Sequence, residues 1–455
     1  MQPMTIQEIE QAVGGVWWNP RSDLPAVTAV STDSRRIMKG CLFIPLIGDQ
    51  FDGHRFIGDA LQRGAAGTLC SKLPADLLPD KFYIKVDDTL LALKALAAAY
   101  RSRFSIPFVQ ITGSVGKTTT KDMIASVLSA KYRVLKTPEN FNNNIGVPLT
   151  LLMLSPDTQV AVIETGMNHF GEIRYLGEMI RPEIAVITNI GDAHIEFLGS
   201  REGILKAKSE IFENLQNGGT AVLNGDDALL DTLDLPFETL RCGQSERCSV
   251  RVTDMADHGV NGITCTVTTA QDKYELYIPA PGEHMVYSAS MAVAIGEKLG
   301  LSREEIIRGV ASFESSGSRM HIVKLAGGRS ILDDCYNANP QSVTAALEIL
   351  AKTECDRKIA VLGDMGELGA LTEQAHYNMG ALAAMLGIDQ VVAIGPKAAK
   401  IAEGTEENGG RAQHFATKEE ALGAVRGHFA ENSAMLIKAS HAMNFGWLVE
   451  QLKSL

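Results

Sequence analysis

The sequence has few of the features that mark secreted or membrane-spanning proteins. Its seven cysteines are scattered and no two form a C-x-x-C pair, which argues against a disulfide framework and a zinc knuckle. No apolar run approaches the roughly 18 residues of a membrane helix. The first residues, MQPMTIQEIEQAVGG, lack the basic start and apolar stretch of a signal peptide. We therefore expect a cytoplasmic protein with reduced thiols and no membrane span.

Positive charge is also scarce. The chain has 42 lysines and arginines against 54 aspartates and glutamates, which gives a formal net charge of −12. Because nothing in the sequence resembles a basic stripe, we expect no nucleic-acid partner. If the ligand is an anion, positive charge must be concentrated at one place, as at Lys117. We also expect the protein to act as a monomer.

The 455 residues suffice for about three domains of roughly 150 residues each. The first hundred mix short β-type runs with turns, and the pattern changes near Pro107. From there valine and isoleucine runs alternate with helices, which is typical of parallel strands covered on both faces. An antiparallel stretch is expected from about Cys242 to Pro281. We predict an α/β protein with domains 1–104, 105–315 and 316–455, the second built on a doubly wound, mostly parallel sheet.

A short glycine-containing loop is the strongest chemical signal. ITGSVGKTTTKDM, residues 111–123, follows a predicted buried strand and opens a helix. It lacks the first glycine of the usual P-loop, because Ile111 stands five residues before Gly116. Such a junction offers backbone N–H groups and a positive helix end to a phosphate. Lys117 adds a charge, and the Thr118 hydroxyl is a ligand for Mg²⁺. The alternative is a glycine-rich turn with a solvated lysine.

Candidate metal ligands follow the next strands. Glu164 ends a strand at the sheet edge where open α/β folds bind ligands, and a carboxylate among apolar residues is costly unless a cation pairs with it. His194, the second candidate metal ligand, follows the next strand. Lys208 lies one helix further on, where at most one of Lys206 and Lys208 faces the site. The alternatives are a satisfied strand-end carboxylate, a structural histidine and a solvated lysine.

Three further polar segments follow or precede predicted elements. In DDCYNANPQS, residues 333–342, an acid suits ribose hydroxyls and an asparagine an adenine edge, with N-capping and turn chemistry as the alternative. NFNNNIGVPLT, residues 140–150, has four asparagines in five positions, which suits a turn or a surface that binds hydroxyls and phosphates. GDMGELG, residues 363–369, is a strand-end turn without the spacing of a G-x-G-x-x-G fingerprint.

Together these segments resemble the Mur ligases of peptidoglycan precursor synthesis, whose nucleotide loop has the same shortened form. They occur in the order of that family across all three predicted domains. The segments are TDSRR (32–36), GDQFDGHRFI (48–57), ITGSVGKTTTKDM (111–123), NFNNNIGVPLTLL (140–152), NHFGEI (168–173), NIGDAHIEFLGSREGILKAKSEIF (189–212), DDCYNANPQS (333–342) and VLGDMGELG (361–369). DDCYNANP with GDMGELG is typical of the member that adds D-alanyl-D-alanine.

The resemblance implies an ATP-dependent ligase that uses Mg²⁺, with two ions expected. Its substrates would be UDP-N-acetylmuramoyl-tripeptide and D-alanyl-D-alanine, joined through an acyl phosphate to give the UDP-N-acetylmuramoyl-pentapeptide. It also implies a small N-terminal α/β domain for the UDP-muramoyl peptide and a central P-loop domain for ATP. A C-terminal Rossmann-like domain would receive the dipeptide and close on ATP.

The resemblance also implies residue roles. Catalytic roles fall to Lys117, Glu164, His194 and Lys208, and the metal ligands are Thr118, Glu164, His194 and a carbamylated Lys208. ATP contacts fall to Gly113, Ser114, Val115, Gly116, Lys117, Thr118, Thr119, His284, Arg319, Asp334, Asn337 and Asn339. The UDP-muramoyl substrate and the dipeptide fall to Ser34, Arg35, Asp52, Gly53, His54, Phe56, Asn142, Asn143, Asn144, Lys438 and Ser440.

Two segments depart from the family pattern. GEHMVYSAS keeps His284 but has Met285 and Ser288 where the family often has asparagines, and K-A-S-H at residues 438–441 replaces K-G-S-R. Within the ligases, the alternatives are a sister ligase that adds another amino acid and a folate polyglutamate-type ligase, although the N-terminal DSR and DGH segments argue against the latter. Outside the ligases, the alternatives are a P-loop kinase or ATPase and a module that only binds. The kinase alternative explains the loop but leaves the last domain without a role.

Overall fold

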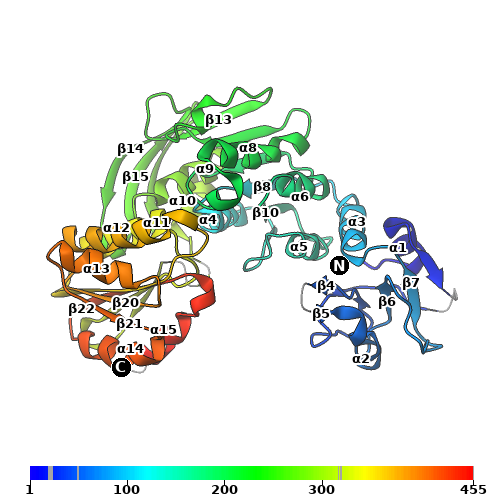
Figure 1. Ribbon diagram of the computed structural model, residues 1–455. Coiled ribbons are helices and arrows are strands. Elements are labelled where there is room, and N and C mark those ends of the chain that lie inside the picture. Colours follow the sequence, from blue (N-terminus) through cyan, green and yellow to red (C-terminus); the bar gives the residue numbers. More distant parts are fainter. Residues whose placement is uncertain (19–23, 49–50, 316, 318–319, 454–455) are drawn as a thin grey trace.

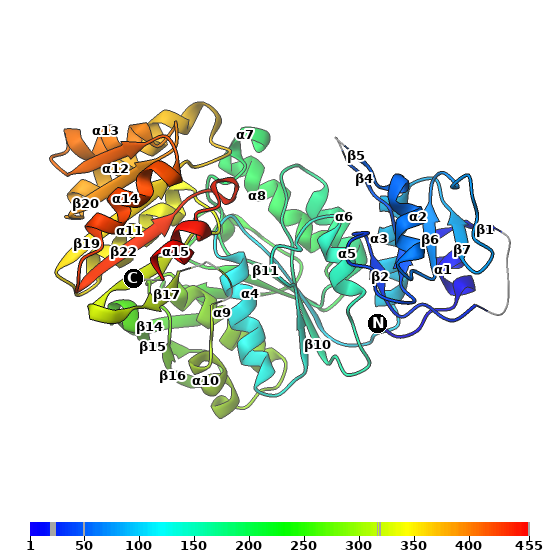
Figure 2. The same ribbon diagram turned by 90° about the horizontal axis from the view of Figure 1, so that it is seen from below.

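The computed structural model describes residues 1–18, 24–48, 51–315, 317 and 320–453. The described residues form three larger sheets, with the N-terminal and C-terminal ones at opposite ends of the molecule and the central one between them (Figure 1, Figure 2). This confirms the predicted α/β class, while the domain limits stay a prediction. Across the described ranges, no helix combines the length and the apolar character that crossing a membrane requires.

The N-terminal sheet is small, with its described strands in the order β1-β7-β6-β3-β2 and β1 antiparallel to β7. Its strands are β1 (Val16–Trp18), β2 (Val30–Ser31), β3 (Leu42–Phe43), β6 (Gly67–Cys70) and β7 (Phe82–Lys85); β4 (Ile47–Gly48) and β5 (Phe51–Asp52) form a separate hairpin, and the helices are α1 (Ile6–Val13), η1 (Gly53–Phe56), α2 (Ile57–Gln62) and α3 (Thr89–Arg101). Asp88 caps the start of helix α3, because its carboxylate accepts hydrogen bonds from the N–H groups of Leu90 and Leu91. Its buried leucines share one core with residues of the central sheet, which joins the two domains.

The central sheet orders its described strands as β16-β15-β14-β13-β12-β11-β8-β10-β9. These strands are β8 (Phe108–Thr112), β9 (Val134–Lys136), β10 (Val160–Glu164), β11 (Ile184–Ile187), β12 (Thr220–Asn224), β13 (Glu238–Gly243), β14 (Val250–Asp257), β15 (Ile263–Thr268) and β16 (Lys273–Ile278). The expected antiparallel stretch is wrong at its start, because Cys242 pairs in parallel with Val250. The turn between them is held by Asp226, which accepts hydrogen bonds from the N–H groups of Gln244 and Ser245.

Helices cover both faces of the central sheet, as the buried valines and isoleucines predict. On one face α4, α9 and α10 enclose the largest core, and on the other α5, α6 and α8 complete two more. The helices are α4 (Lys117–Ser129), α5 (Gly146–Leu151), α6 (Glu172–Ile180), α7 (Ile195–Leu198), α8 (Arg201–Ser209), η2 (Glu210–Asn214), η3 (Leu230–Thr232), η4 (Gly259–Asn261), α9 (Met285–Lys298) and α10 (Arg303–Ala311). Burial on both faces fixes the carboxyl ends of the strands relative to one another.

The C-terminal sheet has the order β17-β18-β22-β19-β20-β21 among its described strands, with β17 antiparallel to β18 and the others parallel. Its elements are β17 (His321–Lys324), η5 (Ala326–Gly328), β18 (Ser330–Asp333), α11 (Pro340–Lys352), β19 (Arg357–Gly363), η6 (Gly369–Leu371), α12 (Thr372–Met385), β20 (Gln390–Ile394), α13 (Ala399–Glu407), β21 (Ala412–Phe415), α14 (Lys418–His428), β22 (Ser433–Lys438), η7 (His441–Met443) and α15 (Gly446–Leu452). Helices again pack on both faces.

The position of β8 determines where a ligand can bind. Strand β8 lies between β10 and β11. The helix after β8, α4, packs on one face of the sheet and the helix after β10, α6, packs on the other, so a crevice opens beside β8 at the carboxyl ends. Glu164 is level with Ile111, and Ile187 is level with Thr112. The loop after β8, the end of β10 and the turn after β11 therefore share one edge of the sheet.

Candidate active site

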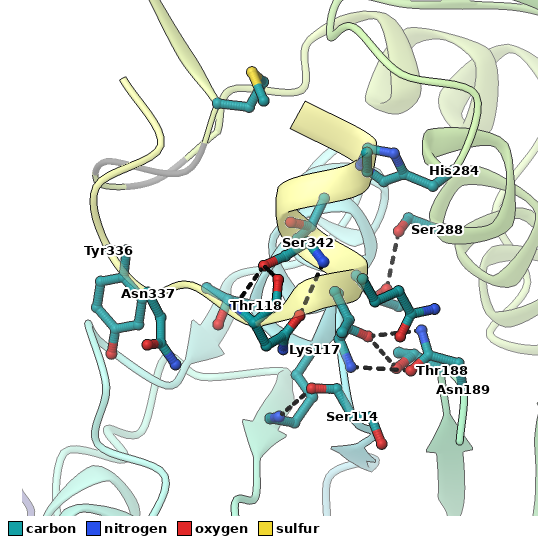
Figure 3. A pocket seen from close by; sticks show the side chains of 18 of the residues that line it. Ser114, Lys117, Thr118, Thr188, Asn189, His284, Ser288, Tyr336, Asn337 and Ser342 are labelled. Carbon is teal, nitrogen blue, oxygen red and sulfur yellow. Dashed lines mark hydrogen bonds between the residues drawn. The ribbon is translucent and has the colours of Figure 1, made fainter. Parts of the chain in front are cut away.

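A cleft of about 550 Å³ lies at this edge, between the central and C-terminal domains (Figure 3). The loop after β8 and the start of α9 form one side, and the turn after β18 with the start of α11 forms the other. The predicted residues that line it are Ser114, Val115, Gly116, Lys117, Thr118, Thr119, Asn142, Asn143, Glu164, His194, His284, Asp334, Asn337, Asn339 and Lys438. The structure thus places together residues that stand more than 300 positions apart in the chain.

Other predicted residues lie elsewhere. Of those that the structure describes, Gly113, Asn144, Lys208 and Ser440 are not in the lining of the cleft. Arg319 lies outside the described residues. The six N-terminal candidates, Ser34, Arg35, Asp52, Gly53, His54 and Phe56, belong to the domain at the far end of the molecule (Figure 1).

The loop after β8 requires glycine at two positions. A Cβ atom on Gly113 would lie 1.9 Å from the Thr188 hydroxyl oxygen, so no side chain fits there. Gly116 has a φ of +81° where α4 begins, a conformation that favours glycine. The Lys117 ammonium donates a hydrogen bond to the carbonyl of Gly113 at 2.7 Å, which holds the lysine over its own loop.

Glu164 is the buried acid of the site, with 1% of its surface exposed. One carboxylate oxygen accepts a hydrogen bond from the Thr118 hydroxyl at 2.7 Å, and the other accepts one from the Asn142 amide at 2.9 Å. The Lys121 ammonium lies 3.9 Å from the first oxygen. The adjacent hydroxyl and carboxylate oxygens are hard donors, and this donor set fits Mg²⁺.

His194 and Lys208 differ in their surroundings. Nδ1 of His194 lies 3.0 Å from a carboxylate oxygen of Glu367 in the C-terminal domain, in a contact without hydrogen-bond geometry. Burial lowers the pKa of Lys208 well below its usual value, and the charge of Lys117 lowers it further. A neutral amine is the form that adds CO₂. Because no cluster of three His, Cys, Asp or Glu side chains is placed to hold a metal among the described residues, a second ion there depends on the carbamate.

The C-terminal wall is organised by Lys438, which is 2% exposed. Its ammonium donates hydrogen bonds to the Asp334 carboxylate and, at 2.9 Å, to the carbonyl of Asn337. The Asn339 side chain accepts a hydrogen bond from the N–H of Ser342 at 2.9 Å and caps α11. The hydrogen bond of the Asn339 side chain therefore agrees with the alternative that this segment caps a helix, although Asn339 also lines the cleft.

The start of α9 lines the cleft on the same side as the loop after β8. The His284 side chain is exposed to the cleft, yet the protein around it lowers its pKa by desolvation, while Asp334 acts in the opposite direction. Ser288 stands where the resemblance expects an asparagine, and its hydroxyl lies 2.9 Å from that of Thr120. This contact joins α9 to α4.

The N-terminal candidates are supported by short local contacts. The Arg35 guanidinium donates two hydrogen bonds to Asp33, which lowers the pKa of that carboxyl to about 2. Nδ1 of His54 lies 2.6 Å from the Asp52 carboxylate. Gly53 is buried, and a Cβ there would lie 2.6 Å from the carbonyl oxygen of Leu46. Arg35 and Phe56 are left exposed to solvent.

Several lining residues were not anticipated. Thr188, Asn189, Tyr336 and Gln341 all line the cleft. Thr188 and Asn189 follow β11 at the same sheet edge as Glu164. Their position directly after a buried strand is the sequence feature from which they could have been identified as site residues. Tyr336 and Gln341 lie inside the segment DDCYNANPQS, in which only the acids and asparagines were given a predicted role.

Family models match most of the chain. The model described as "Mur ligase family, catalytic domain" matches residues 26–101, "Mur ligase middle domain" matches residues 111–296, and "Mur ligase, glutamate ligase domain" matches residues 318–441. These matches fall in the order expected from the sequence motifs.

Whole-chain comparisons agree. UDP-N-acetylmuramoyl-tripeptide–D-alanyl-D-alanine ligase of Bacillus subtilis is 38% identical over 451 residues and covers 98% of each chain, and that of Escherichia coli is 35% identical over 100% of this chain and 99% of its own. A crystal structure of MurF from Acinetobacter baumannii superposes with a TM-score of 0.91 at 32% identity over the whole of both chains. MurF ligase of Thermotoga maritima in complex with ADP gives 0.83 at 26% identity over 94% of this chain and 97% of that chain. The chain belongs to the Mur ligase family.

Proposed function

We propose that the protein is an ATP-dependent ligase that joins D-alanyl-D-alanine to the terminal carboxylate of UDP-N-acetylmuramoyl-tripeptide. The relatives from Bacillus subtilis and Escherichia coli carry the name of this activity over essentially their whole length. The observation that carries the proposal is the cleft in which Lys117 and Glu164 of the central domain face Asp334 and Lys438 of the C-terminal domain. A kinase or ATPase would leave the second wall without a function.

The loop suits the first chemical step. The substrate carboxylate attacks the γ-phosphorus of ATP, the bond to the bridging oxygen breaks, and ADP leaves with its electron pair. Lys117 and the N–H groups at the start of α4 stabilise charge on the phosphate oxygens. Two anions must approach each other in this step, so rigid positioning of both is a large part of the catalysis.

The second step forms the amide. The amine of D-alanyl-D-alanine attacks the acyl carbon, loses a proton, and expels inorganic phosphate from the tetrahedral intermediate. Lys438 of the C-terminal wall would hold the phosphate or the incoming dipeptide at this point, and Asp334, which accepts a hydrogen bond from it, would close on ATP. Both substrates must then be enclosed between the two domains, which excludes water from the acyl phosphate.

Thr118 and Glu164 would hold Mg²⁺, which neutralises phosphate charge when it is bound. The two side chains already lie within 2.7 Å of each other, so few rearrangements are needed. His194 and a carbamylated Lys208 would serve a second ion. Carbon-13 NMR of the protein in ¹³C-bicarbonate tests for the carbamate. A carbamate signal that is present in the wild-type protein and absent in Lys208→Ala supports this assignment. Absence of the signal from both proteins contradicts it.

Phosphate release tests the proposed reaction. The full chain is given ATP, Mg²⁺, UDP-N-acetylmuramoyl-tripeptide and D-alanyl-D-alanine, and each is then left out in turn. We expect release that depends on all four, and a hydroxamate when hydroxylamine replaces the dipeptide. A kinase gives no hydroxamate, a sister ligase prefers another amino acid in a substrate screen, and a binding module releases no phosphate.

A further inference from the structure

The backbone of Val115 in the nucleotide loop is held from both sides by one side chain. Its N–H donates a hydrogen bond to the amide oxygen of Asn189 at 2.9 Å, and its carbonyl accepts one from the amide nitrogen of Asn189 at 3.0 Å. The Thr188 hydroxyl donates a third hydrogen bond to the same carbonyl at 2.6 Å. Figure 3 shows both side chains beside the loop that carries Ser114 and Lys117.

The loop and the turn after β11 are joined at further points. The N–H of Ser114 donates to the carbonyl of Asn189 at 3.1 Å, and the N–H of Gly191 donates to the Ser114 hydroxyl at 2.8 Å. Thr188 also packs against Gly113 so closely that no Cβ is tolerated there. The turn after β11 thus determines the shape of the loop before α4 begins.

The held carbonyl fixes the direction of the next N–H group. In a trans peptide the C=O and the N–H point in opposite directions, so a Val115 carbonyl bound to Thr188 and Asn189 turns the Gly116 N–H away from them. Gly116 and its neighbours line the cleft. Because glycine populates both signs of φ at similar cost, the Val115–Gly116 peptide is free to flip unless something holds it. A flipped peptide would present a carbonyl oxygen to the phosphates, which repels them.

We propose that Thr188 and Asn189 are positioning residues that lock the Val115–Gly116 peptide in the orientation that receives nucleotide phosphate. They act through the backbone of Val115. The inference rests on the proposed function, because it needs a nucleotide at this loop. The resemblance gave neither residue a role, and neither one carries a charge or is a metal ligand in the proposed site.

Two substitutions at one position isolate the hydroxyl of Thr188. Thr188→Val keeps the shape and removes the hydrogen bond, and Thr188→Ser keeps the hydrogen bond and removes the methyl group. Asn189→Ala removes both contacts of the amide. Thr239→Val is the matched control, because the Thr239 hydroxyl also donates to a backbone carbonyl, that of Phe237, but on β13.

Calorimetry with Mg·ADP on each full-length variant measures binding, and steady-state kinetics give a KM for ATP and a KM for the UDP-muramoyl peptide. Binding weakens in proportion to the fraction of loop held in the competent orientation. We expect Thr188→Val and Asn189→Ala to weaken ADP binding and to raise the KM for ATP by about tenfold or more. The KM for the UDP-muramoyl peptide should change less than about twofold, with Thr188→Ser and Thr239→Val close to wild type.

Unchanged ADP binding in both Thr188→Val and Asn189→Ala would overturn the inference. A parallel rise of both KM values would also overturn it, because that pattern indicates a general structural defect. If the wild-type protein itself bound neither ADP nor ATP, the proposed function would fail instead, so the two failures are distinguishable.

Discussion

The nucleotide loop and the N-terminal candidate site are built in opposite ways. The loop follows β8, whose five residues are all buried, and it meets Glu164 at 1% exposure. The N-terminal candidates stand around two-residue strands, and the side chain of Arg35 is 85% exposed. The first region is held by long parallel strands with buried hydrogen bonds, and the second by turns with local ion pairs.

This difference explains how the side chains of each site are held in the orientation that binds the ligand. Groups fixed in a protein interior keep their orientation without a ligand, and their electrostatic interactions are strong because water is excluded. Exposed side chains must be ordered when the ligand binds, and solvent screens their charges. Single substitutions should therefore have effects that fall steeply from the first region to the second.

Lys117→Ala should give the largest effect and tests the catalytic side of the comparison. Removing the charge that faces the phosphates should lower turnover by about two to three orders of magnitude. Lys206→Ala on the same domain is the control, because Lys206 is exposed and lies against Phe170. Phosphate release at saturating substrates measures both variants. Turnover of Lys117→Ala within about threefold of wild type would contradict a phosphate role for this loop.

Lys121→Met sharpens the comparison within one region, because two lysines contact the same acid. Lys121 is 1% exposed and lies 3.6 Å from Asp122, whereas Lys136, with 43% of its side chain exposed, lies 2.7 Å from it. Lys121 also lies 3.9 Å from Glu164, so Lys121→Met removes a buried cation from beside two buried carboxylates, only one of which is paired with Lys136. We therefore expect Lys121→Met to lower the free energy of unfolding by about 3 kcal/mol. Lys136→Met should cost less than about 1 kcal/mol. Urea unfolding of both variants measures this, and equal losses would contradict the burial argument.

Arg35→Ala tests the exposed side. If Arg35 contacts the sugar nucleotide, as the resemblance implies, the KM for the UDP-muramoyl peptide should rise by about tenfold with the KM for ATP unchanged. Arg36→Ala is the matched control, because Arg36 is the adjacent exposed arginine of the same TDSRR segment. A rise in the KM for ATP, or equal effects of the two variants, would break the assignment of Arg35.

The position of the buried nucleotide loop could largely be predicted from the sequence, whereas the exposed parts of the molecule could be predicted less well. Buried valine runs that end in Glu164, and the glycines before Lys117, predicted the sheet edge, because burial on both faces leaves a strong signal. The edge strands β17 and β21 leave a weaker signal in the sequence, since HIVK and AQHF are short and only partly buried. The contacts of Thr188 and Asn189 with Val115 could not be predicted, because they join side chains that follow β11 to the backbone of the loop after β8 and depend on the register of these two strands.

Lys352→Ala gives the smallest expected effect and marks the lower end of the comparison. The Lys352 ammonium of α11 lies 3.1 Å from Asp257 and 2.6 Å from Glu283 and so links the C-terminal domain to the central one. The side chains of Lys352 and Glu283 are about half exposed, and that of Asp257 is 16% exposed. Glu283 raises the pKa of Lys352. A raised folded-state pKa means that this contribution is fully present below the unfolded value of about 10.4 and is lost only as the pH rises through the folded value.

We therefore expect Lys352→Ala to lower the free energy of unfolding by less than about 1 kcal/mol at neutral pH and low salt. The loss should vanish near 1 M salt, where the Debye length is about 3 Å. Urea unfolding at the two salt concentrations measures this. Lys400→Ala is the control, because Lys400 pairs with Glu403 within α13 and joins no domains. A salt-independent decrease of several kcal/mol in the free energy of unfolding of Lys352→Ala would contradict the prediction. It would show that an exposed ion pair stabilises the protein as much as a buried one, against the contrast drawn between the two kinds of region.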